Sequence, residues 1–245
     1  MFLAIPAQQV GGFFTKLQDI SSNTIIILCS KGIYIATGKL LSDVVTDALP
    51  QNKIGIFSGP NFSSEVMNKV LTVSTIASTD LDVADDIASS TDYFKFLPNT
   101  DIIATQICGA LKNVLAIACG VVHGLGMGEN TVAAILTKGI AEIMYVIEKF
   151  GGEAINITSS SGVGDIFLSC NSTTSRNNKF GAMLAKGLDI NPDIVVEGRQ
   201  TIMALSENHR EIVNALPLLD FVYRLSTKKI SGIKAIRSNL LEIFH

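Results

Sequence analysis

The sequence lacks the features that mark several classes of protein. Its formal net charge is −3 at pH 7, so it has no basic surplus of the kind that nucleic-acid-binding domains carry. Its longest apolar runs, residues 24–29 and 114–122, are far shorter than the roughly 20 residues that a membrane helix needs. Residues 1–7 also lack the basic start of a signal peptide. We therefore expect no nucleic-acid partner, no membrane segment and no secretion signal.

Residues that bind metals or form disulfides are few. The four cysteines contain no C-x-x-C pair, and a chain of this length needs no disulfide to hold a core, so we expect reduced thiols and a cytoplasmic location. The three histidines are scattered, and no group of His, Asp, Glu and Cys has metal-ligand spacing. No G-x-S-x-G motif supports a serine hydrolase. We expect no metal site.

Charged residues are scarce, at 17% against 47% hydrophobic residues. A chain this apolar either buries much of its length in a core or exposes surface that a partner or a further segment covers. With 245 residues it can hold one large domain or two small ones.

The pattern of apolar residues changes near residue 100. Before it, β-branched runs alternate with helical stretches, which predicts an α/β layer with ligands at the carboxyl ends of the strands. The expected strands are residues 24–28, 53–57, 70–77 and 93–97, with helices at 38–49 and 81–89. After it, helices are expected at residues 102–122, 130–150, 178–186, 193–207 and 216–225. The pattern predicts a partial Rossmann-like parallel-sheet domain, residues 1–99, followed by an all-helical domain, residues 100–245.

One lysine stands in an unusual setting. Lys112 lies inside residues 107–122, a small, apolar run that predicts a buried helix. Burial lowers the pKa of an amine because it disfavours the charged form, and such an amine can exchange protons near neutral pH. In the alternative interpretation, the stem of Lys112 follows the helix and its head remains in water.

Other polar residues occupy turns suited to ligands. Lys31 follows a predicted strand and precedes a glycine, and Ser58-Gly59-Pro60 brings bare backbone to the end of the next strand. Ser175-Arg176-Asn177 opens a helix, and helix N-termini bind anions. Asp165 ends a glycine-rich turn and can hold lysines in place or cap the next helical turn.

These segments together resemble the bacterial-type NAD(P)-dependent glycerol-3-phosphate dehydrogenases. The resemblance covers nearly the whole chain and rests on six motifs in the family's order. They are Lys31-Gly32-Ile33, the segment from Ser58 to Glu65, the segment from Gly109 to Asn130, Gly162-Val163-Gly164-Asp165, Ser175-Arg176-Asn177 and Glu197-Gly198.

The resemblance implies interconversion of sn-glycerol 3-phosphate and dihydroxyacetone phosphate with NAD or NADP. It implies that Lys112 transfers the proton, that Lys31 and Asp165 support it, and that Ser175-Arg176-Asn177 holds the phosphate. The implied substrate contacts are Lys31, Gly59, Asn61, Lys112, Asp165, Ser175, Arg176 and Asn177. The implied cofactor contacts are Lys31, Ser63, Arg176, Val195 and Glu197. A homodimer is left open.

The chain departs from the family pattern in several places. It has no G-x-G-x-x-G near its start, the turn that holds a dinucleotide pyrophosphate, so we expect the first strand–helix units to be missing and activity to be impaired. Asn61 stands where the family has a small hydroxyl residue, Ser63 where it has alanine, and the segment from Arg176 to Glu197 is shorter. Asn61 can instead cap the helix that follows.

Two alternatives remain. A non-catalytic remnant that binds phosphate or a partner is consistent with the absent turn. Another hydroxyacid dehydrogenase of similar architecture would usually space its lysine and asparagine by one helical turn, whereas Lys112 and Asn113 are adjacent.

Overall fold

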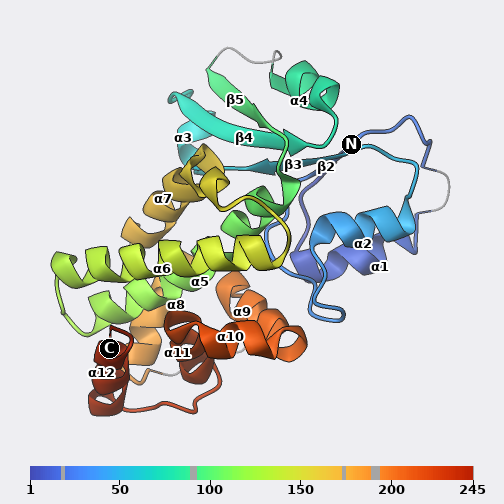
Figure 1. Ribbon diagram of the computed structural model, residues 1–245. Helices are drawn as coiled ribbons and strands as arrows, with labels where there is room; N and C mark the ends of the chain where they lie inside the picture. The colour runs from blue at the N-terminus through green and yellow to red at the C-terminus, as the bar shows by residue number, and fades with distance from the viewer. Residues whose placement is uncertain (18–19, 89–92, 173–174, 189–193, 245) are drawn as a thin grey trace.

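The computed structural model describes residues 1–17, 20–88, 93–172, 175–188 and 194–244. A sheet with short helices forms the first part of the chain, and a group of helices forms the rest (Figure 1). The predicted fold class, a Rossmann-like sheet followed by helices, is therefore confirmed.

The sheet has five strands in chain order: β1 (Phe2–Leu3), β2 (Ile26–Leu28), β3 (Ile54–Ser58), β4 (Thr72–Ser78) and β5 (Phe94–Asn99). Strands β1, β2 and β3 are mutually parallel and β5 is parallel to β4, but β4 is antiparallel to β3. The reason lies in the connection between them. Its helix α3 (Ser63–Met67) has five residues and rises only about 7.5 Å, too little to carry the chain back along a strand of about 17 Å.

Short helices cover the sheet. One-turn helix η1 (Ala7–Gln9), α1 (Val10–Phe14) and α2 (Leu41–Ala48) pack on β1–β3, where Val10, Val45 and Ile26 are fully buried. Helix α4 (Leu81–Ala88) packs on β4 and β5. Helices α2 and α4 fall within the predicted ranges, α3 is the helix that was expected after Asn61, and α1 was not predicted.

Helix α5 (Ile102–Gly124) forms the centre of the second part. Every residue from 104 to 122 is buried, as expected of a helix that is apolar on all sides. Asp101 caps its start by accepting a hydrogen bond from the Ala104 backbone N–H at 2.8 Å. The helices packed against α5 are α6 (Glu129–Lys149), α7 (Asp165–Asn171), α8 (Arg176–Ala185), α9 (Glu197–Asn208) and α11 (Pro217–Ser226).

The remaining elements are short. Segments η2 (Ala154–Thr158) and η3 (Ser160–Gly164) lead into α7, and α10 (Arg210–Ala215) and α12 (Ile233–Glu242) flank α11. The predicted helix at residues 193–207 is confirmed as α9, although Asp193 lies outside the described residues. The other predicted helices of this part are confirmed within two residues at their ends.

Two glycines let α5 and α8 meet backbone to backbone. A Cβ added to Gly120 would lie 2.0 Å from the Asn178 carbonyl oxygen, and one added to Gly181 would lie 2.0 Å from the Ile117 carbonyl oxygen. No side chain fits at that distance. The contact fixes the start of α8 against the central helix.

By length and composition alone, α5 and α6 could each cross a membrane. Core helices of globular proteins pass the same test, and 89% of the apolar window of α5 is buried inside the protein, against 39% for α6.

Candidate active site

The centre of the site is a carboxylate between two lysines. Asp165, the first residue of α7, is 1% exposed. Its Oδ1 accepts a hydrogen bond from Lys112 Nζ of α5 at 2.5 Å, and its Oδ2 accepts one from Lys31 Nζ at 2.7 Å. Lys112 is 8% exposed, so its head does not reach water freely. Asp165 also does not act as a helix cap, because Gly164 holds that position.

This arrangement changes the protonation of Lys112. Burial, with the positive charge of Lys31 nearby, lowers the pKa of Lys112 from 10.5 to about 8, although Asp165 opposes the shift. A group with a pKa near 8 holds and releases a proton within the range where enzymes work.

The ends of strands β2 and β3 bring backbone close to the Lys31 side chain. Lys31 follows β2, and Ser58-Gly59 ends β3, with Lys31 Nζ 3.5 Å from the Gly59 carbonyl oxygen. Gly59 has φ +149°, and a Cβ there would lie 2.8 Å from Ser74 Cα on the next strand. Only glycine therefore fits at this turn.

A second polar cluster joins three helices beside the first. Asn177 of α8 donates to Asn113 Oδ1 at 2.9 Å, and Asn113 of α5 donates to Glu197 Oε2 of α9 at 3.1 Å. The Gly198 backbone N–H donates to Asn177 Oδ1 at 3.0 Å. Arg176 lies 3.7 Å from Glu197 Oε1, and its side chain is 68% exposed. The guanidinium is therefore held near the site by a weak contact and remains free to bind an anion.

A cavity of about 420 Å³ lies between the two clusters. Lys31, Arg176, Val195 and Glu197 line it, together with residues 4–7, Cys29, Ser30 and Gln200. Four of the five residues that the resemblance implied for the cofactor are thus brought together. Ser63 is not among them, because it is exposed on α3.

Two other predicted residues have local surroundings that the sequence did not settle. Asn61 donates to Ser74 Oγ at 3.5 Å and makes no cap, because Phe62 holds the cap position of α3. Ser175 stands at the cap position of α8, but its side chain makes no capping hydrogen bond. The Ser175 hydroxyl and the Asn61 side-chain amide are therefore available to a ligand.

The site contains residues that stand in the motifs named from the sequence but were given no role there. Asn113 is one, since only the fold shows that it links α8 and α9 to the lysine helix. Ser58 is another: its hydroxyl is buried and has no hydrogen-bond partner in the part of the chain that the structure describes. Gly109 precedes Lys112 by three residues in the same motif, and a Cβ on it would lie 3.0 Å from that hydroxyl.

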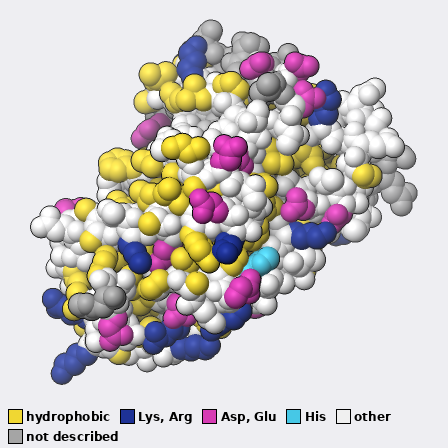
Figure 2. Space-filling model, viewed as in Figure 1, with side chains coloured by type: hydrophobic (Ala, Val, Ile, Leu, Met, Phe, Trp, Pro, Cys, Tyr) yellow, Lys and Arg dark blue, Asp and Glu magenta, His cyan; other side chains and the backbone are white. Residues whose placement is uncertain are grey.

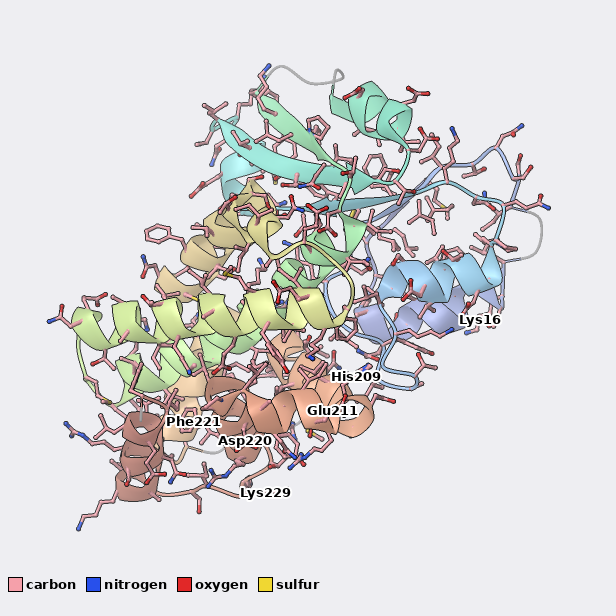
Figure 3. All side chains as sticks on the ribbon, in the orientation of Figure 1. Lys16, His209, Glu211, Asp220, Phe221 and Lys229 are labelled. Carbon is pink, nitrogen blue, oxygen red and sulfur yellow. The ribbon has the colours of Figure 1, made fainter. Side chains whose placement is uncertain are left out.

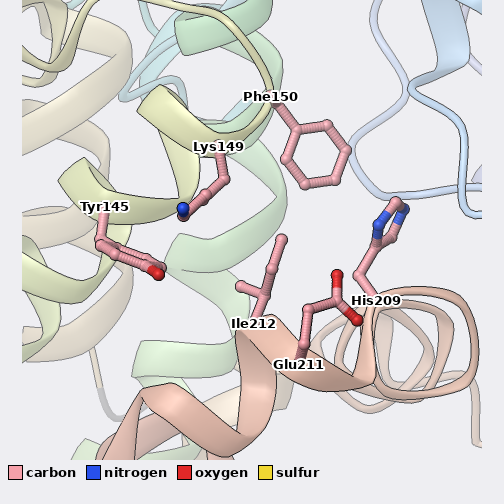
Figure 4. Close-up of a pocket in the computed structure, with 6 residues that line it drawn as sticks. All are labelled: Tyr145, Lys149, Phe150, His209, Glu211 and Ile212. Atoms are coloured by element: carbon pink, nitrogen blue, oxygen red, sulfur yellow. The ribbon is translucent and has the colours of Figure 1, made fainter.

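A separate hollow of about 360 Å³ lies between the end of α6 and the start of α10 (Figure 4). Two of its polar groups have contacts of their own. His209 Nε2 is 3.0 Å from the Gly38 carbonyl oxygen, and Lys149 Nζ stands 5.1 Å from the centre of the Tyr145 ring. None of the predicted site residues lines it.

Comparison with known proteins agrees with this geometry. Residues 1–84 match the family described as NAD-dependent glycerol-3-phosphate dehydrogenase N-terminus, and residues 101–237 match its C-terminus. A glycerol-3-phosphate dehydrogenase [NAD(P)+] from Clostridium tetani is 34% identical over 91% of this chain and 66% of its own length. One from Clostridium botulinum is 34% identical over 99% of this chain and 77% of its own length.

Solved structures give the same result. The crystal structure of glycerol-3-phosphate dehydrogenase from Coxiella burnetii has a TM-score of 0.89 and 27% identity, over 100% of this chain and 76% of that one. The enzyme from Saccharomyces cerevisiae has a TM-score of 0.83 and 26% identity, over 98% of this chain and 74% of that one. The fold is that of a dinucleotide-dependent oxidoreductase. The chain belongs to the NAD(P)-dependent glycerol-3-phosphate dehydrogenase family.

Proposed function

We propose that this chain interconverts sn-glycerol 3-phosphate and dihydroxyacetone phosphate with NAD or NADP. The observation that carries the proposal is the buried Asp165 carboxylate, which the buried Lys112 shares with the partly buried Lys31, with the pKa of Lys112 lowered to about 8. The family matches support the same reaction. They do not favour another hydroxyacid dehydrogenase or a non-catalytic remnant.

Lys112 transfers the proton in this proposal. It donates to the carbonyl oxygen of dihydroxyacetone phosphate during reduction and accepts from the hydroxyl of glycerol 3-phosphate during oxidation. Asp165 holds Lys112 and Lys31 at a fixed spacing, with contacts of 2.5 and 2.7 Å. Lys31 adds positive charge beside the oxygen that gains negative charge, which stabilises the transition state.

The phosphate of the substrate binds at the start of α8. Ser175, Arg176 and Asn177 supply a free hydroxyl, a planar cation and an amide there, and the helix N-terminus favours an anion. Gly59 and Asn61, past the end of β3, contact the other end of the substrate.

The cavity beside Lys31 fits the nicotinamide end of a dinucleotide. Its lining combines Lys31 and Arg176 with backbone at residues 4–7 and the carboxylate of Glu197, so it offers hydrogen bonds to hydroxyl and amide groups. When bound, the nicotinamide supplies or accepts the hydride. Val195 and, from α3, Ser63 complete the proposed cofactor contacts. Nothing in the lining distinguishes NAD from NADP.

The same proposal assigns the parts of the chain. Residues 1–99 serve the dinucleotide and residues 100–245 serve the substrate and the proton. The four cysteines are free thiols, as in the reducing cytoplasm where we place the protein. A homodimer stays open.

Because these 245 residues contain no G-x-G-x-x-G, we propose that they bind the dinucleotide weakly and turn over slowly.

The function is tested by following NADH oxidation with different substrates. We expect oxidation that depends on dihydroxyacetone phosphate, at a low rate, and none with the oxidised forms of 3-hydroxyisobutyrate or 6-phosphogluconate. Because turnover is expected to be slow, binding of glycerol 3-phosphate is measured in parallel by calorimetry. Arg176→Gln should weaken that binding about tenfold, because it removes a charge-assisted phosphate contact. Preference for a hydroxyacid, or equal binding of glycerol and glycerol 3-phosphate, would contradict the proposal.

A further inference from the structure

A third cavity, which shares no lining residue with the other two, lies where the ends of α8 and α11 meet the start of α12. Its volume is about 440 Å³, within the range of small-molecule sites. Its apolar wall includes Phe180, Leu184, Leu225 and Ile236. A shallower groove continues from it around Gly187 and Gly232. Figure 1 shows these helices toward the lower end of the molecule.

The charge of this lining is one-sided. Arg199 and Lys228 line the cavity, and Lys186 and Lys234 line the adjoining groove, while no Asp or Glu among the described residues lines either. The whole chain, by contrast, has 22 acidic and 19 basic residues. Neither Arg199 nor Lys228 forms an ion pair within the described ranges. Figure 2 shows that Lys and Arg side chains are frequent along this lower end.

A buried hydroxyl in the cavity has no partner. Ser226, the last residue of α11, is 5% exposed, and its Oγ has no hydrogen-bond partner among the described residues. An unsatisfied buried hydroxyl costs stability, and Ser226 lines the cavity, so a ligand that approaches its Oγ there would supply the missing acceptor.

Lys228, two residues after Ser226, lines the same cavity and has a strained backbone conformation. Lys228 has φ +59°, the left-handed region, which glycine or asparagine occupies at lower cost. The turn itself is closed by Lys229, whose N–H donates to the Arg224 carbonyl at 2.8 Å. The Lys229 side chain, marked in Figure 3, turns to Tyr223 at 3.3 Å. A lysine kept at the strained position instead of glycine places a free cation at the cavity.

We propose that this cavity binds an anionic amphiphile: a single alkyl chain of about ten carbons with a carboxylate or phosphate head, the size that such cavities take. The head accepts hydrogen bonds from Ser226 and pairs with Arg199 and Lys228. The alkyl chain covers the apolar wall and the neighbouring Leu188 and Ile233, which are otherwise 53% and 57% exposed.

Calorimetric titration with decanoate, below the concentration at which it forms micelles, tests this site. We expect saturable binding with one site per chain, and weaker binding of decanol and of decyltrimethylammonium. Decyl phosphate is titrated in parallel, and the tighter of the two anions identifies the head group. Ser226→Ala should weaken decanoate binding about tenfold, because a hydrogen bond to a charged group is lost.

The Ser226 variant separates binding from folding. Since the hydroxyl has no partner without a ligand, Ser226→Ala should leave thermal stability unchanged or raised while binding falls. Thr105→Val removes another buried, unpartnered hydroxyl, one that lines neither groove, and should leave binding unchanged. Arg199→Gln with Lys228→Gln should make decanoate bind no better than decanol. Unchanged binding in both Ser226→Ala and the double variant, or no saturable binding at all, would overturn the proposal.

Discussion

The environment of Lys112 decides the chemistry of its amine. Lys112 shares a buried carboxylate with Lys31, and two ammonium groups on one carboxylate leave one excess positive charge away from water. Such a charge is costly, and the lowered pKa of Lys112 follows from that cost.

Replacing Lys112 by arginine tests its role as proton carrier. Arginine keeps its proton throughout the working pH range, so Lys112→Arg should lose about 100-fold or more in kcat. Lys39→Arg, an exposed lysine paired with Asp47, is the matched control and should stay near wild type. Steady-state rates of dihydroxyacetone phosphate reduction measure both, and a Lys112→Arg rate within a few-fold of wild type would leave Lys112 a structural residue.

Lys31 should affect binding as well as rate. Its Nζ lies between Asp165 and the Gly59 carbonyl, and its side chain also lines the cavity proposed for the cofactor. Lys31→Ala should therefore raise KM for the substrate and weaken NADH binding, in addition to lowering kcat. A variant with lowered kcat and unchanged KM for both would show that Lys31 acts only in the transition state.

At the scale of elements, the contact between α5 and α8 sets the position of the proposed phosphate site. Gly120→Ala would place a methyl group 2.0 Å from the Asn178 carbonyl oxygen, so we expect a loss of about 3 kcal/mol in the free energy of unfolding. Gly12→Ala in α1, where a Cβ meets nothing within 4 Å, should instead gain up to about 1 kcal/mol. Urea denaturation compares the two, and equal stabilities would mean that the helices do not pack this closely.

The start of α11 is held by a buried carboxylate. Glu142 of α6 is 3% exposed and accepts the backbone N–H groups of Leu218 at 2.9 Å and Leu219 at 3.0 Å. Burial raises the pKa of Glu142 above 4.5, more than these hydrogen bonds and Lys138 lower it. Because the folded state then binds its proton more tightly than the unfolded state, the contribution of Glu142 to stability falls as pH rises from about 4.5 through the raised pKa.

Glu142→Gln should remove this pH dependence. The amide keeps one acceptor and loses the other, so the variant should be about 1 to 2 kcal/mol less stable, with a flatter stability profile between pH 4 and 7 than wild type. Thermal unfolding across that range measures it. A Glu142→Gln profile in which stability still falls with pH as steeply as in the wild type would assign the slope to other groups.

At the scale of the molecule, periodicity predicted the long elements and missed the short ones. The run from residue 102 was recognisable because its apolar residues continue for many turns, and α5 begins at Ile102 as predicted. Helices α1 and α7 have five and seven residues, too few to show a helical period. The antiparallel β3–β4 pair depends on the length of α3, which the pattern did not reveal.

The site was predicted less completely than the fold, for physical reasons. In a helix buried on all sides, periodicity cannot tell which way Lys112 points, and the pairing with Asp165 joins residues 53 positions apart. The family motifs contained most residues of the two clusters, but they gave no role to Asn113, whose partners lie on α8 and α9. Only the packing of three helices shows its role as a link between the clusters.

The chain as a whole should bind NADH weakly. Its described cavity offers contacts for one end of a dinucleotide, and no G-x-G-x-x-G turn is present in the 245 residues to hold the pyrophosphate. Isothermal titration should give a dissociation constant well above the micromolar range. Micromolar affinity or tighter in the 245-residue chain would show that other residues hold the pyrophosphate.

The protonation of Lys112 is the most direct test of the whole account, because it does not require turnover. With lysines labelled at the ε-carbon, NMR titration should show one resonance with a pKa of about 8. That resonance should be absent from Lys112→Arg and present in Lys39→Arg. A spectrum in which every lysine titrates at 10 or above would contradict the account, since Lys112 could then not exchange a proton at the pH of the reaction.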